Sequence, residues 1–265
     1  MDHDIGNLLN EWDFSPDEFL ARRIKTPDGS EKIQIRIDMG ILQLETAGRP
    51  DGLEPHGYKS LLDYYMAQAA EAKDEDFTLD EDECEDLFQE AWQFYHRYLS
   101  LFYLEDYKGV VTDTAHTLKV FDLVDEYAPN DEIRWYFEQY YPHAIMMKTR
   151  AQAMTALDGE DYPAALRAVE KGIADIETFV DEWETDIEED LPEIAFLREW
   201  YEELEQERPL TPREQLERDL TAAVEDDDFE EAARLRDKIK TMWPGPVPRR
   251  QFRPDRPDRP DRPER

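Results

Sequence analysis

The sequence predicts a mainly α-helical protein with a small β element near its N-terminus and a helical hairpin near its C-terminus. Between about residues 57 and 242, apolar residues recur with the period of α-helices. The segment Ile33–Met39 instead places an apolar residue at every second position, which is typical of a half-buried strand. With 265 residues, of which 40% are hydrophobic, the chain is long enough to bury a core.

The first segment, residues 1–56, is expected to hold a short helix and a β-hairpin. Ser15 and Glu18 have the spacing of a capping box, with Pro16 at the first helical position. The alternating strand at Ile33–Met39 follows a Pro-Asp-Gly turn, and further apolar residues come after Gly40. These apolar residues predict a second strand that pairs with the first.

The body, residues 57–208, reads as a series of helices. The first expected helix of the body is amphipathic. A second helix is expected to begin near Thr78, whose spacing to Glu81 is that of a capping box. The residues of the first face are Leu61, Leu62, Tyr65 and Met66.

A repeat of 55 residues runs through this body. Glu105-Asp106-Tyr107 recurs as Glu160-Asp161-Tyr162. The apolar register then continues in five pairs, Val110 with Ala165, Val111 with Leu166, Leu118 with Ile173, Phe121 with Ile176, and Val124 with Phe179. A tyrosine just after an interhelical turn resembles the tetratricopeptide (TPR) hairpin, whose usual period of about 34 residues is shorter. The resemblance implies TPR-like hairpins; two unrelated hairpins that share a common turn are the alternative.

The segment 212–243 predicts a hairpin of two short helices around the acidic turn Asp226–Asp228. Its apolar stripes consist of Leu216, Leu220, Ala223 and Val224 on the first helix and of Phe229, Ala232, Ala233, Arg236 and Ile239 on the second. The stretch resembles the UVR motif, the helical hairpin named after the bacterial excision-repair proteins UvrB and UvrC. The rest of the chain resembles uncharacterised bacterial proteins that end in this motif.

The resemblance implies a protein–protein contact, as between UvrB and UvrC and in adaptors of bacterial proteolysis and arginine-kinase systems. A hairpin of about 30 residues buries too little apolar surface alone, so it should dock onto a partner, a second copy or its own body. We expect Asp228 to cap the second helix and Phe229 to fill the gap at the turn. The expected contact residues are Leu216, Leu220, Ala223, Phe229, Ala232, Ala233, Leu235 and Ile239. Polar contacts of Arg236 and Asp237 are expected to set the register between the hairpin and its partner.

Charge restricts the partners that the chain is expected to bind. Acidic residues number 66 against 31 basic ones, a formal net charge of −35. Nucleic acids and anionic membranes need Lys and Arg opposite their phosphates, so we expect direct contact with neither. A halophilic host would produce the same acidic surface without any acidic function.

The compartment is expected to be the cytoplasm. A single cysteine, Cys84, leaves no disulfide framework. We expect no signal peptide, because the first residues lack a basic and an apolar region, and no apolar run approaches the ~18 residues of a membrane span.

Catalysis, metal binding and cofactor binding are not expected. Asp113 and His116 have the i, i+3 spacing of half a di-iron set, but no second such pair occurs. Acidic neighbours should raise the pKa of the Cys84 thiol and make it inert. The main nucleotide-binding and hydrolase motifs are missing from the sequence. We therefore predict a non-catalytic adaptor.

Two other functions stay open. One is an accessory role in nucleotide-excision repair, through a protein partner, because residues 212–243 hold ten acidic and six basic residues. The other is an unrecognised enzyme with a carboxylate site, which several acids buried together in a concave pocket would favour.

Aromatic residues at helical spacing form either core or a groove. They are Phe94, Tyr95, Tyr98, Phe102, Tyr103, Trp135, Tyr136, Phe137, Tyr140 and Tyr141. Exposed among carboxylates, such residues would suit basic peptides through cation–π contacts and ion pairs. The chain carries a basic segment itself, since residues 249–265 hold seven arginines and four acids. We expect residues 244–265 to form a disordered tail, which either folds back onto the acidic body or stays solvated.

Overall fold

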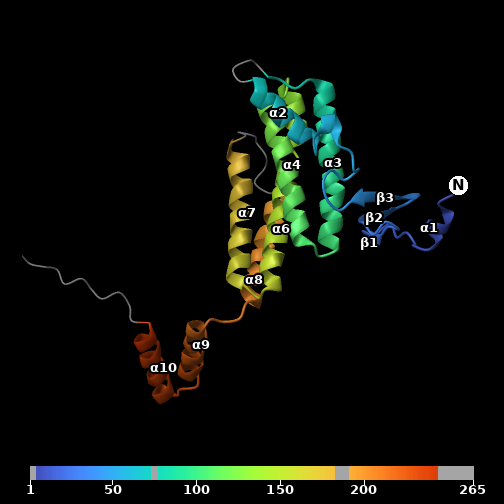
Figure 1. Ribbon diagram of the computed structural model, residues 1–265. Helices are drawn as coiled ribbons and strands as arrows, with labels where there is room; N and C mark the ends of the chain where they lie inside the picture. Colours follow the sequence, from blue (N-terminus) through green and yellow to red (C-terminus); the bar gives the residue numbers. More distant parts are fainter. Residues whose placement is uncertain (1–3, 73–76, 183–190, 244–265) are drawn as a thin grey trace, which may run out of the picture. The chain divides into compact units, whose positions relative to one another are not determined.

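The structure, a computed structural model, describes residues 4–72, 77–182 and 191–243. It divides into two compact units, residues 1–207 and residues 208–265 (Figure 1). The expected class is confirmed, because a small antiparallel sheet is followed by helices up to a C-terminal helix pair. None of the helices in these ranges is long and apolar enough to cross a membrane. The expected tail lies outside the described residues.

The sheet has three antiparallel strands in the order β1-β2-β3. They are β1 (Ala21–Lys25), β2 (Glu31–Ile37) and β3 (Gly40–Glu45), preceded by the short helix α1 (Gly6–Asn10). The predicted pairing of two strands after residue 30 is confirmed, whereas β1 was not predicted. The helix expected from Ser15 is wrong, because this segment instead turns into β1, and Arg36 on β2 donates its backbone N–H to the carbonyl of Leu20 at 2.9 Å.

Both faces of the central strand are covered. Ile33 and Ile35 pack in one hydrophobic cluster with Tyr98 and Leu101 of the first long helix. On the opposite face Arg36 is also buried, and its guanidinium donates to the carbonyl of Trp12 at 2.7 Å. The sheet therefore shares a core with the helices that follow it.

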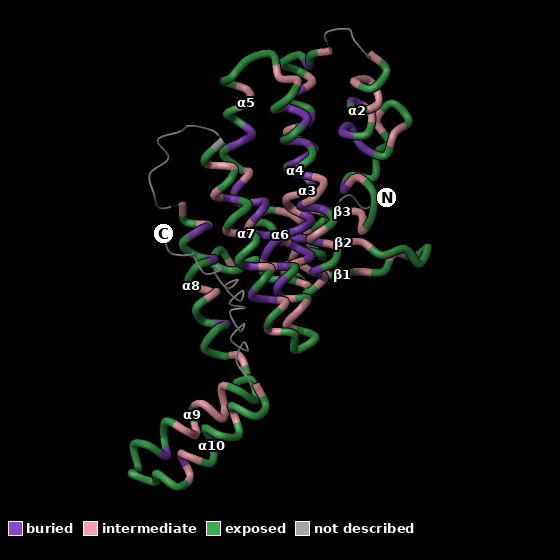
Figure 2. The backbone as a smooth tube through the Cα atoms, turned by 90° about the vertical axis from the view of Figure 1, so that its left-hand side faces the viewer, coloured by how far each residue is buried: buried purple, intermediate pink, exposed green. Residues whose placement is uncertain are grey.

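The helices of the first unit lie side by side, and their buried residues gather on the facing sides (Figure 2). After the short 3-10 turn η1 (Pro55–Gly57), these helices are α2 (Leu61–Ala72), α3 (Glu81–Tyr103), α4 (Tyr107–Tyr127), α5 (Asp131–Glu138), α6 (Tyr141–Asp158), α7 (Tyr162–Glu182) and α8 (Pro192–Glu207). Helix α3 packs on α4, α4 on α6, and α6 on α7, while α8 contacts both α6 and α7.

Two predicted details of these helices are wrong. Helix α3 is capped by Asp80, whose side chain pairs reciprocally with Glu83, so the capping box lies two residues after the expected one at Thr78. Met66 on α2 is 49% exposed, whereas the other three residues of its predicted face are buried.

One turn joins α3 to α4 and α6 to α7. In each, a glutamate adopts the left-handed conformation, with φ of 60° at Glu105 and 56° at Glu160. The next residue donates its N–H to a carbonyl five residues back, at 2.8 Å for Asp106 and 2.9 Å for Asp161. The same aspartate then caps the following helix through its side chain.

The 55-residue repeat corresponds to these two hairpins. All five register pairs are buried or half-buried in both copies. The helices are 18 to 23 residues long, and α5 is inserted between the two hairpins, which accounts for the long period. A TPR-like relationship stays a prediction.

Two buried charges on α3 fix the segment that leads out of the sheet. Glu90 is fully buried and accepts hydrogen bonds from the N–H of Leu61 at 2.7 Å and of Leu62 at 3.2 Å, which caps α2. Arg49 lies 3.3 Å from the same carboxylate. Two turns further along, Arg97 donates to the carbonyl of Gly48 at 2.7 Å.

Helices α6 and α7 approach most closely at Gly172. A Cβ added there would lie 2.1 Å from the Oγ1 atom of Thr149, which is itself buried. Only glycine fits at this crossing.

We predict that Gly172→Ala lowers the free energy of unfolding by about 1–3 kcal/mol, because the extra methyl overpacks the crossing. Denaturant titration of both proteins measures the change. Gly159→Ala is the control, since its Cβ would meet only a carbonyl at 3.4 Å. Adding Thr149→Ala to Gly172→Ala should recover part of the loss; an equal loss in the control would contradict the prediction.

Glu138 is buried, and neither of its carboxylate oxygens has a hydrogen-bond partner among the described residues. Burial, with a smaller contribution from Asp125, raises the pKa of Glu138 to about 7. The folded state therefore binds this proton more tightly than the unfolded chain does. Stability that is present below pH ~4.5 is lost as the pH rises through about 7.

We predict that Glu138→Gln stabilises the protein by roughly 1–3 kcal/mol at pH 8 and changes little at pH 4.5, where the wild-type carboxyl is neutral. Denaturant titrations at both pH values measure the difference. Glu132→Gln, at an exposed neighbouring position, should show no such dependence. A gain that is the same at both pH values would rule out ionisation of Glu138 as its cause.

Candidate protein-binding site

The predicted hairpin is formed by α9 (Pro212–Glu225) and α10 (Phe229–Met242). Thr211 begins α9 with a capping box: its hydroxyl accepts the N–H of Glu214 at 3.2 Å, and Glu214 accepts the N–H of Thr211 at 2.8 Å. Arg208 contacts both oxygens of Glu214, at 2.9 and 2.7 Å. This pairing, followed by the hydrogen bonds with Thr211, lowers the pKa of Glu214 below its usual range.

The turn between α9 and α10 repeats the turn found twice in the first unit. Asp227 has a φ of 57°, and Asp228 donates its N–H to the carbonyl of Ala223 at 2.8 Å. The predicted capping role of Asp228 is confirmed, since its side chain accepts the N–H of Glu231 at 3.1 Å. All three turns are followed at once by an aromatic residue.

That aromatic residue has a different environment in the hairpin. Tyr107 is buried and Tyr162 half-buried, whereas Phe229 is 67% exposed. The expectation that Phe229 fills the gap at the turn is therefore wrong. The two alanines nearest the turn, Ala223 and Ala232, close that gap because they let the helices approach.

The core of the hairpin is small. Ala223, Ala232 and Leu235 are its buried residues, with Leu216 and Leu220 packed half-buried against them. Ala233 and Ile239 are also half-buried. The structure thus assigns part of the predicted contact set to the seam between the two helices.

The remaining predicted residues lie on the surface of the hairpin. Arg236 and Asp237 are exposed and pair with each other at 3.0 Å. Val224 is 49% exposed and Met242 54% exposed. Together with Phe229 they leave apolar surface in water, which a folded hairpin of this size cannot cover by itself.

Asp113 and His116, considered above for metal binding, make hydrogen bonds to other side chains, and Cys84, considered for thiol chemistry, is buried. Asp113 receives two hydrogen bonds from Arg97, at 2.7 and 2.8 Å, while His116 lies 3.0 Å from Glu90 instead. The described ranges hold no cluster of three or more side chains suited to a metal ion. Cys84 is buried, and burial, followed by nearby carboxylates, raises its thiol pKa to about 11.

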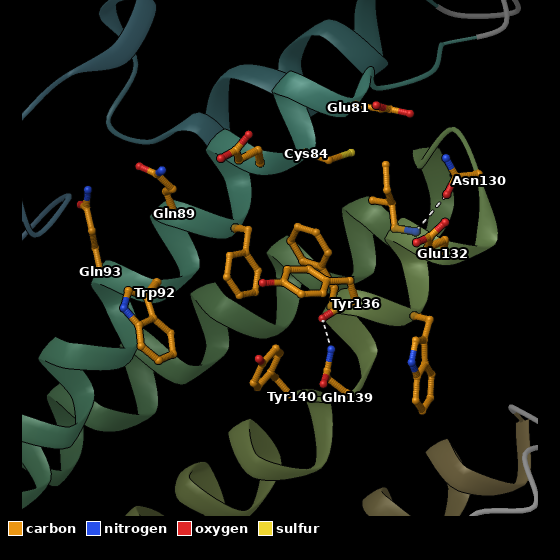
Figure 3. Close-up of a pocket in the computed structure, with 15 residues that line it drawn as sticks. Glu81, Cys84, Gln89, Trp92, Gln93, Asn130, Glu132, Tyr136, Gln139 and Tyr140 are labelled. Atoms are coloured by element: carbon orange, nitrogen blue, oxygen red, sulfur yellow. Dashed lines mark hydrogen bonds between the residues drawn. The ribbon is translucent and has the colours of Figure 1, made fainter.

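A second candidate binding surface is a groove in the first unit, between α3 and α5 (Figure 3). This α3–α5 groove, of about 1090 Å³, is lined by residues of α3 between Glu81 and Gln93 and by residues between Asn130 and Tyr140. Of the predicted aromatic residues, Trp135, Tyr136, Phe137 and Tyr140 line it, whereas Phe94 and Tyr98 belong to the core. Phe88 and Trp92 were not predicted, although they follow Glu81 at i+7 and i+11 on one helical face.

Comparison with known proteins supports the assignment of the hairpin. Residues 213–242 match the UvrB/uvrC motif, which covers 30 of the 265 residues and nearly all of α9 and α10. No curated protein and no solved structure matches the chain. The motif is associated with excision repair and with protein–protein contact, and it stands here in a unit of its own.

Proposed function

We propose that this protein is a non-catalytic adaptor that binds another protein through the α9–α10 hairpin. The observation that carries the proposal is Phe229, an aromatic side chain left 67% exposed, whereas the aromatic residues after the two equivalent turns are buried (Tyr107) or half-buried (Tyr162). A partner that packs against this end of the hairpin would remove the ring from water.

The size of the hairpin core supports the same proposal. Three buried side chains, two of them alanines, give far less apolar burial than an independent domain needs. A second helical hairpin, from a partner or from another copy, would complete an antiparallel four-helix core. Leu216, Leu220 and Ile239 are half-buried at the edges of the seam and are suited to extend such a core.

The absence of catalysis is part of the proposal. The acids that line the α3–α5 groove, Glu81, Glu85 and Glu132, are exposed. The buried acids described above are Glu90, Asp113 and Glu138, and none of them lines that groove. This separation disfavours an acid–base pair, because catalytic carboxylates need both a concave site and a perturbed environment.

An accessory role in excision repair is the second candidate, favoured by the family of the matched motif. In this role the chain would bind a repair protein and not DNA, because the hairpin segment itself is acidic. Purified UvrB or UvrC that binds the chain through Phe229 would support this role. Retention of DNA by the isolated protein would point to a different route.

We predict that Phe229→Asp reduces partner binding at least tenfold, because a charge at the centre of an apolar contact must be desolvated without a partner. Affinity capture with the full chain as bait, followed by titration of the captured protein, measures the loss. Light scattering on the same samples detects self-association.

Leu53→Asp is the matched control, since Leu53 is 62% exposed in the first unit. The wild-type and control baits should retain the same partner, or form the same dimer, and the Phe229→Asp bait should not. Equal retention by all three baits would argue against the hairpin as the contact site.

A further inference from the structure

We propose that the α3–α5 groove is a second docking site, which takes an arginine-bearing extended segment of another protein. The site is separate from the hairpin and goes beyond the adaptor contact proposed above. Its support is that one groove combines exposed aromatic rings with carboxylates and has no Lys, Arg or His among its described lining residues.

Solvent-exposed aromatic rings line the groove. Trp92, Trp135 and Tyr136 are each about half exposed, at 48%, 49% and 48%. Phe88 packs against two rings of the groove, with ring centroids 4.6 Å from Tyr136 and 5.8 Å from Tyr140. Figure 3 shows Trp92, Tyr136 and Tyr140 gathered in one region, with Glu81 and Glu132 lying toward the N-terminal end of α3. Such half-exposed rings offer flat faces to a ligand.

The charge of the groove selects a cation. Three carboxylates line it, those of Glu81, Glu85 and Glu132, and none of its described lining residues is Lys, Arg or His. Elsewhere in the described body, aromatic faces already hold guanidinium groups, such as Arg22 at 4.1 Å from the Trp12 ring and Arg150 at 4.5 Å from the Phe102 ring. The groove rings have no such partner among the described residues.

Arginine fits this groove better than lysine. A guanidinium is planar, so it stacks on a ring while its edge donates two hydrogen bonds to a carboxylate. Lysine carries a point charge that can do only one of these at a time.

The dimensions favour an extended segment. The α3 residues that line the groove lie within a stretch of thirteen residues, Glu81 to Gln93, or roughly 18 Å of helix. An extended chain covers that length with about five or six residues. The occupant is therefore a short peptide segment with more than one arginine.

A segment of another protein is favoured over the chain's own residues 249–265. That stretch carries an acidic residue after each Arg-Pro pair from Arg253 onward. Those acids would face the carboxylates of the groove and offset the attraction of the arginines.

The test is fluorescence anisotropy of a labelled peptide of alternating arginine and proline, titrated with the full chain. We expect saturable binding that weakens as salt rises. Trp135→Ala should weaken it about two- to fivefold, the range for one cation–π contact, and Glu132→Gln by a similar factor. A lysine version of the peptide should bind more weakly than the arginine peptide.

Two controls match these variants. Tyr103 on α3 is 50% exposed and lies outside the groove, so Tyr103→Ala should leave binding unchanged. Glu199 is an exposed acid on α8, and Glu199→Gln should likewise have no effect. Equal losses in groove and control variants, equal affinity for the lysine peptide, or no binding would overturn the proposal.

A full-length variant with glutamine at the seven arginines of residues 249–265 tests the source of the segment. Unchanged affinity for the peptide supports a segment of another protein. Tighter binding would overturn that source in favour of competition by the chain's own arginines. The hairpin variant Phe229→Asp should bind the peptide as the wild type does, which separates this site from the adaptor contact.

Discussion

The architecture of the first unit depends on the charged and polar side chains that α3 buries on one of its faces. Glu90 and Arg97 are buried and lie seven residues apart, and each holds part of the segment between the sheet and α2, while the half-buried Gln93 between them binds Asp51 of that segment. Two of them also bind α4, through His116 and Asp113. A buried charge is tolerated only where its partners are in place, so these contacts allow one arrangement of sheet, α2, α3 and α4.

The same contacts determine what α3 presents on its opposite side. Successive helical residues are rotated by about 100°, so Phe88 and Trp92 project roughly opposite to Glu90 and Arg97. Fixing one face against the sheet therefore fixes the aromatic face toward α5. The direction in which Phe88 and Trp92 face therefore follows from the polar contacts on the other side of α3.

The sequence predicted those helices and strands that are encoded by a pattern within a short stretch of residues. Helical periodicity predicted the long helices, the alternation at Ile33–Met39 predicted β2, and the spacing of Leu216 to Ile239 predicted the hairpin. Strand β1 has no alternation and becomes a strand only because β2 offers it an edge. Helical periodicity places Glu90 beside the apolar face of α3 but does not show that the start of α2 covers it, and the burial of aromatic residues depends on which helices meet. The groove and the exposure of Phe229 therefore needed the three-dimensional structure.

Within the described parts of the chain the left-handed acidic turn occurs three times, in two separate units, with the same hydrogen bonds. A turn that is self-contained can be copied without redesigning what surrounds it, and the helices it joins need only be lengthened or shortened. In stacked-repeat proteins, terminal hairpins carry a polar outer face that stops the array. The α9–α10 hairpin has a different outer face, since its exposed residues include Val224, Phe229 and Met242. On the proposal made above, it is built like a repeat whose neighbour comes from a different molecule.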